Sequence, residues 1–338
     1  MKARQISKVI GEKVAELAKA HPEISGVLLK NSIVTGGCIA SMLLKEKVND
    51  FDIYFDNLNS MLDVIQYFGV KTGAEYLVAF QANKPLPKDG RIRPLYANHR
   101  NYEADEADEE LTVTLPTSNE SVWYALYSDL SGLHGCDQIH YVSLYYKSSG
   151  YWAAGEEKEE DAKEKYRVRF ASSNAVTLSD KVQLVFRFFG PPDEIHKNYD
   201  FVHATNYWTN KTGLVTNTKA LEAVLARELV YQGSRFPLAS IFRTRKFIHR
   251  GWSIHIGHYV KMAFQLNEYN LKDLNTLREQ LTGVDAAYLN GIIAAAERHP
   301  EAITCSWVCE LVDAIIHGGN FDADENEDRE MGARDDET

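Results

Sequence analysis

Hydrophobic residues follow two different periods along the chain, which divides it into a mixed first part and a helical second part. Helical spacing occurs over 7–20 and 58–67, whereas strand-like alternation occurs over 139–146 and 182–188. Shorter strands are expected over 111–115, 166–171, 176–178 and 200–208. Helices are expected over 219–231, 238–250, 254–266, 271–281, 285–298 and 302–316. We therefore predict an α+β protein in which a mixed sheet precedes a C-terminal helical bundle.

These patterns also predict where the domains begin and end. Residues 1–216 are expected to form the sheet domain, with a long insertion at about 69–180 that contains two charged runs and several prolines. Residues 217–319 are expected to form the helical domain. Residues 320–338 are so acidic and so poor in apolar side chains that a disordered tail is expected.

The stretch 33–55 is the most informative part of the sequence. A β-prone run ends at Thr35, Gly36 and Gly37 break it, and residues 38–47 show the spacing of an amphipathic helix. Residues 50–55 then alternate as a strand, with Asp50 and Asp52 on the face opposite the apolar residues. A bare glycine turn followed by an exposed acidic strand is the alternative interpretation of this stretch.

The residue types in this stretch point to phosphate and metal chemistry. Two carboxylates two positions apart on a strand repel each other, and a hard divalent cation such as Mg²⁺ relieves that repulsion. Gly36 and Gly37 carry no Cβ and stand at a helix N-terminus, where a phosphate group can approach backbone N–H groups. The hydroxyls of Thr35 and Ser41 are further candidates for contacts with a phosphate.

A glycine pair, a helix and an Asp-x-Asp strand resemble the head motif of the nucleotidyltransferase superfamily, which includes DNA polymerase β, tRNA nucleotidyltransferases and poly(A) polymerases. The departures are Ile39-Ala40-Ser41, where the tRNA enzymes have Arg-Asp, and the lack of an RRDF-type base-reading motif. CCA addition is therefore not supported. The stretches 173–178 and 181–208 are similar to phage-encoded nucleotidyltransferase-like proteins, which suggests a viral setting.

The resemblance implies a third carboxylate that completes a metal site. Asp200 is the choice because it opens a predicted strand after a turn, whereas Asp129 and Asp137 fall in a loop rich in Ser and Gly. Asp50, Asp52 and Asp200 would hold two Mg²⁺ ions, with Mn²⁺ as a substitute. The implied reaction transfers NMP from an NTP such as ATP to a hydroxyl of an RNA or protein acceptor, with release of pyrophosphate.

A local concentration of positive charge is a second candidate site. Residues 233–262 contain no Asp or Glu, and Arg243, Lys246 and Arg250 fall at i, i+3 and i+7 of one predicted helix. Such a face suits the triphosphate of an NTP or the backbone of a nucleic acid. The alternative is that it pairs with the acidic loops or tail of this same chain.

Net charge and cysteine spacing limit the classes of protein that this sequence can belong to. The net charge is −11, but residues 321–338 contribute nine acids against two arginines, so a nucleic-acid partner is not excluded. No apolar run reaches membrane-spanning length, the amphipathic N-terminus does not resemble a signal peptide, and the four cysteines lack zinc spacing. We expect a cytoplasmic protein without a membrane partner. An inactive scaffold, also compatible with a virion, and a nucleic-acid-binding module are the alternatives to an enzyme.

Overall fold

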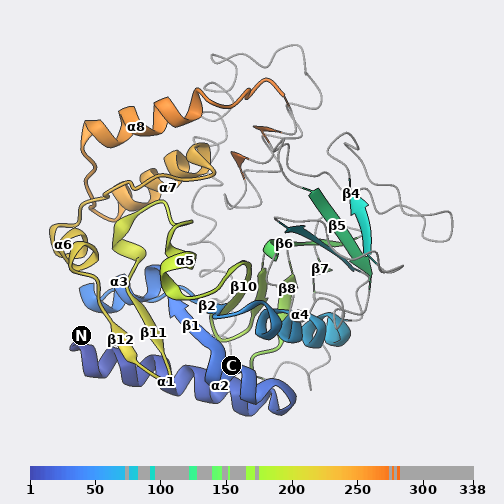
Figure 1. Cartoon of the computed structure of the whole chain (residues 1–338). Coiled ribbons are helices and arrows are strands. Elements are labelled where there is room, and N and C mark those ends of the chain that lie inside the picture. Colours follow the sequence, from blue (N-terminus) through green and yellow to red (C-terminus); the bar gives the residue numbers. More distant parts are fainter. Residues whose placement is uncertain are drawn as a thin grey trace, which may run out of the picture. The chain divides into compact units, whose positions relative to one another are not determined.

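The computed structural model describes residues 1–72, 76–82, 92–95, 122–127, 139–146, 151–152, 165–171, 175–273, 276–277 and 280–281. The chain belongs to the α+β class, as the sequence predicted (Figure 1). Its helices are α1 (Ala3–Ala20), α2 (Ser25–Asn31), α3 (Gly37–Leu44), α4 (Leu58–Thr72), α5 (Pro192–His196), α6 (Thr218–Ala226), α7 (Pro237–His249) and α8 (Ile256–Leu266). Its strands are β1 (Ser32–Thr35), β2 (Phe51–Phe55), β3 (Tyr76–Ala82), β4 (Ile92–Leu95), β5 (Val122–Tyr127), β6 (Ile139–Tyr146), β7 (Tyr151–Trp152), β8 (Val168–Ala171), β9 (Ala175–Leu178), β10 (Val182–Phe189), β11 (Tyr207–Thr209) and β12 (Gly213–Val215).

The main sheet is mixed and has eight strands in the order β12-β11-β1-β2-β10-β9-β8-β7. The central neighbours β2 and β10 are parallel, whereas the other neighbouring strands are antiparallel. Because β2 and β10 are far apart in sequence, the centre of the sheet joins two distant parts of the chain. The first part of the chain therefore cannot complete this sheet alone.

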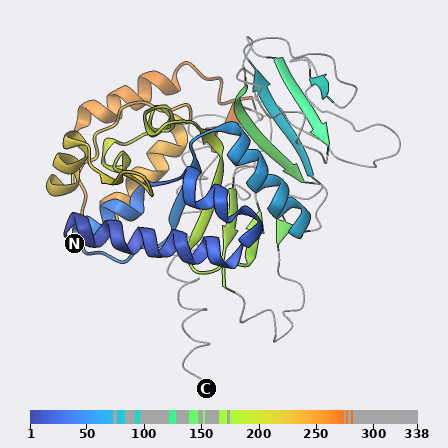
Figure 2. The ribbon, with the colours of Figure 1, turned by 60° about the horizontal axis from the view of Figure 1, so that its bottom comes forward.

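The alternation along β1 and β2 gives the sheet two different faces. Val34 and Ile53 point into the main core with residues of α1, α2, α3 and α4, and Figure 2 shows α1, α2 and α4 on one side of the strands. Ile33 and Tyr54 point to the opposite face, where they pack with Ile195 of α5. The predicted division between two faces is confirmed for Phe51–Phe55, whereas Asp50 precedes the strand. Asp52 shares the parity of Tyr54 and so belongs to the α5 face.

A second, four-stranded sheet has the order β4-β5-β3-β6 and consists of antiparallel pairs. Its strands fall within the predicted insertion, and the predicted strand over 139–146 is confirmed as β6. The strand predicted over 111–115 lies outside the described residues.

The chain divides into two compact units. The first comprises Met1–Gly233 and Trp252–His255, and the second comprises Ser234–Gly251 and Ile256–Thr338. In the second unit α7 packs against α8, so the C-terminal region is helical as predicted. The predicted helices over 285–298 and 302–316 and the predicted tail over 320–338 lie outside the described residues. None of the helices described combines the length and hydropathy that crossing a membrane requires.

The strand predicted over 200–208 is the main error in the secondary structure. This stretch forms a single 3-10 turn, Val202–Ala204, before β11 begins at Tyr207. The hydroxyl of Thr205 donates to the carbonyl of Val202 at 2.8 Å, so local hydrogen bonds replace part of a strand ladder. The helix predicted over 219–231 also ends early, at Ala226, because Arg227 adopts a left-handed conformation with φ 51°.

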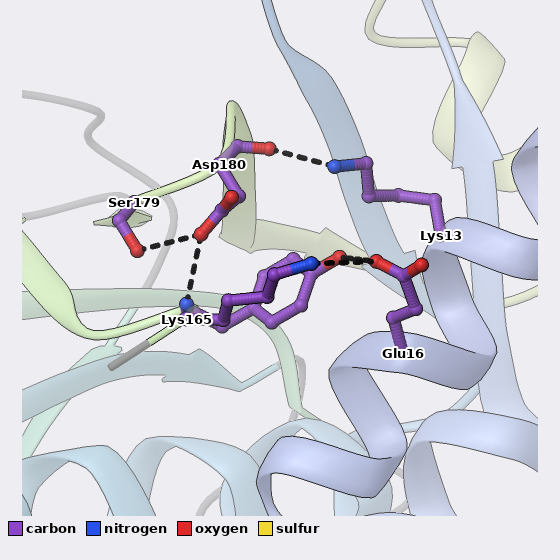
Figure 3. A network of polar contacts seen from close by, with 6 residues as sticks. Lys13, Glu16, Lys165, Ser179 and Asp180 are labelled. Carbon is purple, nitrogen blue, oxygen red and sulfur yellow. Dashed lines mark hydrogen bonds and ion pairs between the residues drawn. The ribbon is translucent and has the colours of Figure 1, made fainter. Parts of the chain in front are cut away.

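A buried tyrosine fixes the point where the chain enters β8. Tyr166 has φ 59°, and its backbone N–H donates to Asp180 at 3.1 Å while its hydroxyl donates to Glu16 at 2.9 Å. Asp180 also accepts from Ser179 at 2.9 Å, and Lys13 donates to the Asp180 carbonyl at 3.0 Å. Figure 3 shows Lys13 and Glu16 of α1 reaching toward this turn. These contacts hold a backbone conformation that a bulky residue rarely adopts.

The imidazole of His21 contacts two segments that are distant in the sequence. Nδ1 of His21 lies 3.1 Å from the hydroxyl of Tyr67 in α4, and Nε2 lies 3.1 Å from the carbonyl of Tyr166. His21 is 2% exposed, so each nitrogen needs such a partner. His21 therefore links α4 to the residue that precedes β8, two segments that are far apart in the sequence.

We expect Tyr166→Phe to lower the free energy of unfolding by about 1 kcal/mol, because the Glu16 carboxylate loses a partly buried hydrogen-bond donor. Lys165→Ala is the matched control: its ion pair with Glu16 spans 3.8 Å between side chains that are 66% and 55% exposed. Exposed pairs of this kind contribute about 0–1 kcal/mol. Chemical denaturation of both variants measures the difference, and equal losses would contradict the role assigned to the tyrosine hydroxyl.

Candidate functional site

A row of polar side chains crosses the α5 face of the main sheet at one level. The backbone register aligns Tyr207 with Thr35, Thr35 with Asp52, Asp52 with Gln183, and Gln183 with Thr177. Residues that are paired across neighbouring strands project to the same face. Asp52 therefore stands between a hydroxyl on β1 and an amide on β10. The sequence predicted Thr35 and Asp52 as site residues, whereas Gln183 was missed.

The backbone of Gly36 lies directly beside the Asp52 carboxylate. Its φ of 91° is a conformation that side-chain-bearing residues rarely adopt, and its N–H donates to the carbonyl of Ala204 at 3.1 Å. A Cβ at this position would lie 3.1 Å from Oδ2 of Asp52, so the missing side chain lets the backbone and the carboxylate face each other. The sequence thus correctly placed this glycine beside the acidic strand.

Helix α3 begins beside the same carboxylate. Gly37 is its first residue, and a Cβ there would meet nothing within 4 Å, so space is open at the helix N-terminus. The N–H groups of a first helical turn have no partners within the helix and favour anions. An anion at this end would lie close to Asp52, so a cation between the two would favour its binding.

The surroundings of Asp52 disfavour its ionised form, which a nearby positive charge would stabilise. Burial first, and the neighbouring charge of Asp50 second, raise the pKa of Asp52 from its usual range to about 7. Asp50 precedes β2 and is exposed, whereas Asp52 is half-buried. A divalent cation favours the ionised form of both groups and removes their repulsion. Carboxylate oxygens are the ligand type that Mg²⁺ and Mn²⁺ prefer.

A hydrogen-bond network around the Thr35 hydroxyl stabilises the end of β1, from which Gly36 turns. The hydroxyl of Thr35 lies 2.9 Å from Nε2 of His196, 3.2 Å from the carbonyl of Ala204 and 2.9 Å from the carbonyl of Asn206. Thr35 is fully buried. Burial lowers the pKa of His196 to about 4, against the opposing charge of Asp193, so the imidazole is neutral at pH 7. The structure places the Thr35 hydroxyl among protein partners, where it holds β1 in position.

Two tyrosines complete the α5 side of the site. The hydroxyl of Tyr199 interacts with those of Tyr54 and Thr35, and it lies 3.8 Å from the position of a Gly36 Cβ. Burial, then Tyr54 and Asp52, raise the pKa of Tyr199 well above its ordinary value, so the phenol keeps its proton. Sequence reasoning did not select Tyr199 or His196 as site residues; His196 ends α5, and Tyr199 follows it three residues later.

The buried side of α3 holds the remaining predicted hydroxyl. Ser41 lies one turn into the helix and is 5% exposed. Nearer the turn, the thiol of Cys38 donates to the carbonyl of Thr35 at 3.6 Å, and burial followed by the charge of Asp52 raises its pKa. This thiol therefore stays protonated and acts as a packing group.

Among the residues that the structure describes, no third carboxylate is grouped with Asp50 and Asp52. Across the described part of the chain, no cluster of three His, Cys, Asp or Glu side chains is placed to hold a metal ion. Asp200 does not open a strand, and its carbonyl accepts from the N–H of Gln232 at 2.9 Å. The strand position directly beside Asp52 on β10 carries Gln183 instead. Asp129 and Asp137 lie outside the described residues.

The predicted basic face belongs to the second unit, whereas the site at Gly36 belongs to the first. Arg243 and Lys246 lie on α7, and Arg250 forms its C-terminal cap with its guanidinium 5.7 Å from the ring of Phe247. Lys246 is exposed and the two arginines are half-buried. Cations near a helix C-terminus interact favourably with its dipole, which gives Lys246 and Arg250 a structural contribution as well.

The fold and this site together define an α+β protein with a carboxylate pair beside a glycine-bounded helix N-terminus. A family model described as Gad2, Gabija anti-defense 2 family protein, matches residues 5–227, and the chain belongs to this family. No curated protein and no solved structure gives a match. The matched residues include the polar row, the glycine turn and Asp50.

This match corrects the resemblance to the nucleotidyltransferase superfamily and to nucleotidyltransferase-like phage proteins. The family that covers the chain is an anti-defence family, and no nucleotidyltransferase family matches. The resemblance rested on a short local pattern of glycines, helix and acidic strand, which does not determine a family. An anti-defence family is nonetheless consistent with the phage setting suggested by the sequence.

We expect Gly36→Ala to destabilise the protein by about 1–3 kcal/mol, because a Cβ is strained at positive φ and meets the Asp52 carboxylate. Gly37→Ala is the matched control. Its Cβ enters open space at a helical position, so a change of at most about 1 kcal/mol in the stabilising direction is expected. Urea denaturation of the two variants tests this contrast, and similar stabilities would show that the turn is not constrained as described.

We expect Asp52→Asn to raise the melting temperature at pH 8 and to leave it nearly unchanged near pH 4. A carboxyl whose folded-state pKa is raised to about 7 contributes stability at low pH that is lost as the pH rises through that value. The asparagine variant lacks this loss. Thermal melts in the presence of a chelator, with Asp63→Asn as the control, measure it; a pH-independent difference between wild type and Asp52→Asn contradicts the assigned pKa.

Proposed function

We propose that this chain counteracts a Gabija defence system and that the site at Gly36 and Asp52 is required for that activity. The observation that carries the proposal is the family match over residues 5–227, which contains every residue of that site. The half-buried carboxylate of Asp52, with the charge of Asp50 near it, reduces stability at neutral pH. Retaining such a pair is understandable if it binds a ligand that the protein needs.

The chemistry that the site supports best is metal-dependent nucleotidyl transfer. Asp50 and Asp52 would hold a divalent cation, and the N-terminus of α3 would receive phosphate oxygens beside Gly36 and Gly37. Bound there, Mg²⁺ or Mn²⁺ would supply positive charge to the phosphates of an NTP. The acceptor hydroxyl would give its proton to solvent water, form a bond to the α-phosphorus and displace pyrophosphate. An RNA end or a protein hydroxyl is the proposed acceptor.

The side chains around the site would each contribute to this reaction in a different way. Thr35 and His196 would fix the end of β1 from which Gly36 turns, and so would set the distance between the helix N-terminus and Asp52. The protonated phenol of Tyr199 faces the same space and would offer a neutral group beside the carboxylate. Positioning of this kind contributes strongly to transfer reactions, because reacting groups must be held in line.

A second candidate function is nucleotide or nucleic-acid binding without turnover. The observation that favours it is Gln183, a neutral amide at the strand position directly beside Asp52. An amide there can donate to a phosphate oxygen or coordinate through its carbonyl, but it adds no charge to a metal site. In this case the chain would oppose Gabija by sequestering a nucleotide or nucleic acid.

The two candidates separate in one experiment. Cells carrying a Gabija system are infected with a phage that Gabija restricts, and plaques are counted with wild-type chain, the double variant Asp50→Asn/Asp52→Asn, and the control Asp63→Asn on α4, outside the site. We expect the wild type and the control to restore plaques and the double variant to lose at least about tenfold, because it cannot hold a cation. Purified proteins are then incubated with Mg²⁺, α-labelled NTPs and total RNA or cell extract.

Each outcome has one meaning. If the wild type restores no plaques, the anti-defence proposal is wrong. If the double variant restores plaques fully, the site is not required. Loss of plaques together with loss of label transfer supports nucleotidyl transfer, whereas loss of plaques without any label transfer by the wild type supports binding without turnover.

A further inference from the structure

Two stretches of the first unit that are distant in the sequence pair with each other close to Tyr199. An antiparallel bridge joins Phe201 and Tyr231, whose buried rings have centroids 5.8 Å apart. The backbone N–H of Gln232 also donates to the carbonyl of Asp200 at 2.9 Å. The stretch that ends in Gln232 is therefore held along the stretch that follows Tyr199.

The side chain of Gln232 makes a second attachment between these stretches. Its Nε2 donates to the carbonyl of His196 at 2.9 Å and to the carbonyl of Tyr199 at 2.7 Å. A side-chain amide nitrogen carries two hydrogens, so both are used. The carbonyl of His196 also accepts from the N–H of Tyr199 at 3.1 Å. One side chain thus joins the end of α5 to the turn that carries Tyr199.

Both residues that this amide holds contribute to the site. Nε2 of His196 lies 2.9 Å from the hydroxyl of Thr35, and the hydroxyl of Tyr199 lies 3.8 Å from the position of a Gly36 Cβ. Helix α5 has only five residues, too few to be stable without tertiary contacts. The last carbonyls of a helix lack partners within it, and Gln232 supplies a donor to the final one of α5. The positions of His196 and Tyr199 therefore depend on contacts from outside α5.

We propose that Gln232 is a positioning residue, which holds His196 and Tyr199 against the glycine turn so that the turn keeps its distance from Asp52. This inference rests on the proposed function, which takes the site at Gly36 and Asp52 to be the one that counteracts Gabija. Gln232 is exposed, and both of these side-chain contacts go to backbone carbonyls, so it would act through the two residues that it holds. The alternative is that its hydrogen bonds add stability without affecting the site.

The titration of His196 separates positioning from plain stabilisation. Burial keeps the pKa of this imidazole at about 4 in the wild type. We expect Gln232→Leu, which keeps the size of the side chain and removes its donors, to expose His196 to water and raise that pKa by about one unit or more. Tyr166→Phe is the matched control: it loses a hydrogen bond to Glu16 that involves no residue of the site, and the pKa of His196 should not change. NMR of the full chain with labelled histidine measures the titration, and His196→Gln identifies the signals.

Hydrogen exchange and plaque counts use the same variants. Exchange over 192–200, measured by mass spectrometry, should be faster by about tenfold in Gln232→Leu, because the end of α5 opens more easily. Gln232→Lys restores a donor of similar reach and should restore the protection. In the plaque assay, Gln232→Leu should give at least about tenfold fewer plaques than Tyr166→Phe. Circular dichroism checks that each variant is folded, and Gln232→Ala replaces Gln232→Leu if it is not.

The proposal is supported if Gln232→Leu, but not Tyr166→Phe, raises the pKa of His196, speeds exchange and loses plaques. It is overturned if His196 titrates as in the wild type, if Tyr166→Phe shifts the titration equally, or if Gln232→Lys does not restore protection. A shifted titration with full plaque restoration also overturns it, because the site then functions without these contacts. Failure of the proposed function is seen separately, as plaque restoration by Asp50→Asn/Asp52→Asn, and the titration of His196 does not depend on that result.

Discussion

The close approach of the Gly36 backbone to the Asp52 carboxylate is the contact on which the site depends. It requires a positive φ at the end of β1, a helix that starts at once after it, and a carboxylate carried by the neighbouring strand. Each of these is stabilised by the core on the other face of the sheet, where Val34 and Ile53 are completely buried. A large apolar core thus compensates for the cost of one desolvated acid.

The polar row on the α5 face shows how a sheet can combine side chains from distant segments. Thr35 and Asp52 come from the first part of the chain, whereas Gln183 and Tyr207 arrive more than a hundred residues later. The parallel pairing of β2 with β10 sets which residue stands beside Asp52. A shift of one residue in that register would replace an amide with an apolar side chain at this position. The composition of the site is therefore a property of the sheet topology.

Local patterns in the sequence predicted the elements of the site but not its full membership. The alternation over 50–55 and the glycine pair were sufficient to predict β2, the start of α3 and the position of Gly36 beside the acids. Gln183, His196 and Tyr199 could not be found in this way, because their proximity to Asp52 depends on long-range pairing. Asp200 was chosen from an alternating pattern, but hydrogen bonds around Thr205 turn the chain there. The family was also not predicted. The resemblance rested on a short pattern of glycines, helix and acidic strand, which indicates a type of chemistry but does not determine a family.

The two hydrogen bonds of His21 have a consequence for how this architecture can vary. They hold Tyr67, in the last turns of α4, and Tyr166, just before β8, on the two sides of one imidazole. A loop whose ends are already held together carries little closure entropy of its own when its length changes. A change in the length of the connection between α4 and β7 should therefore cost little, whereas β7 itself must be kept because it pairs with β8 at the edge of the main sheet.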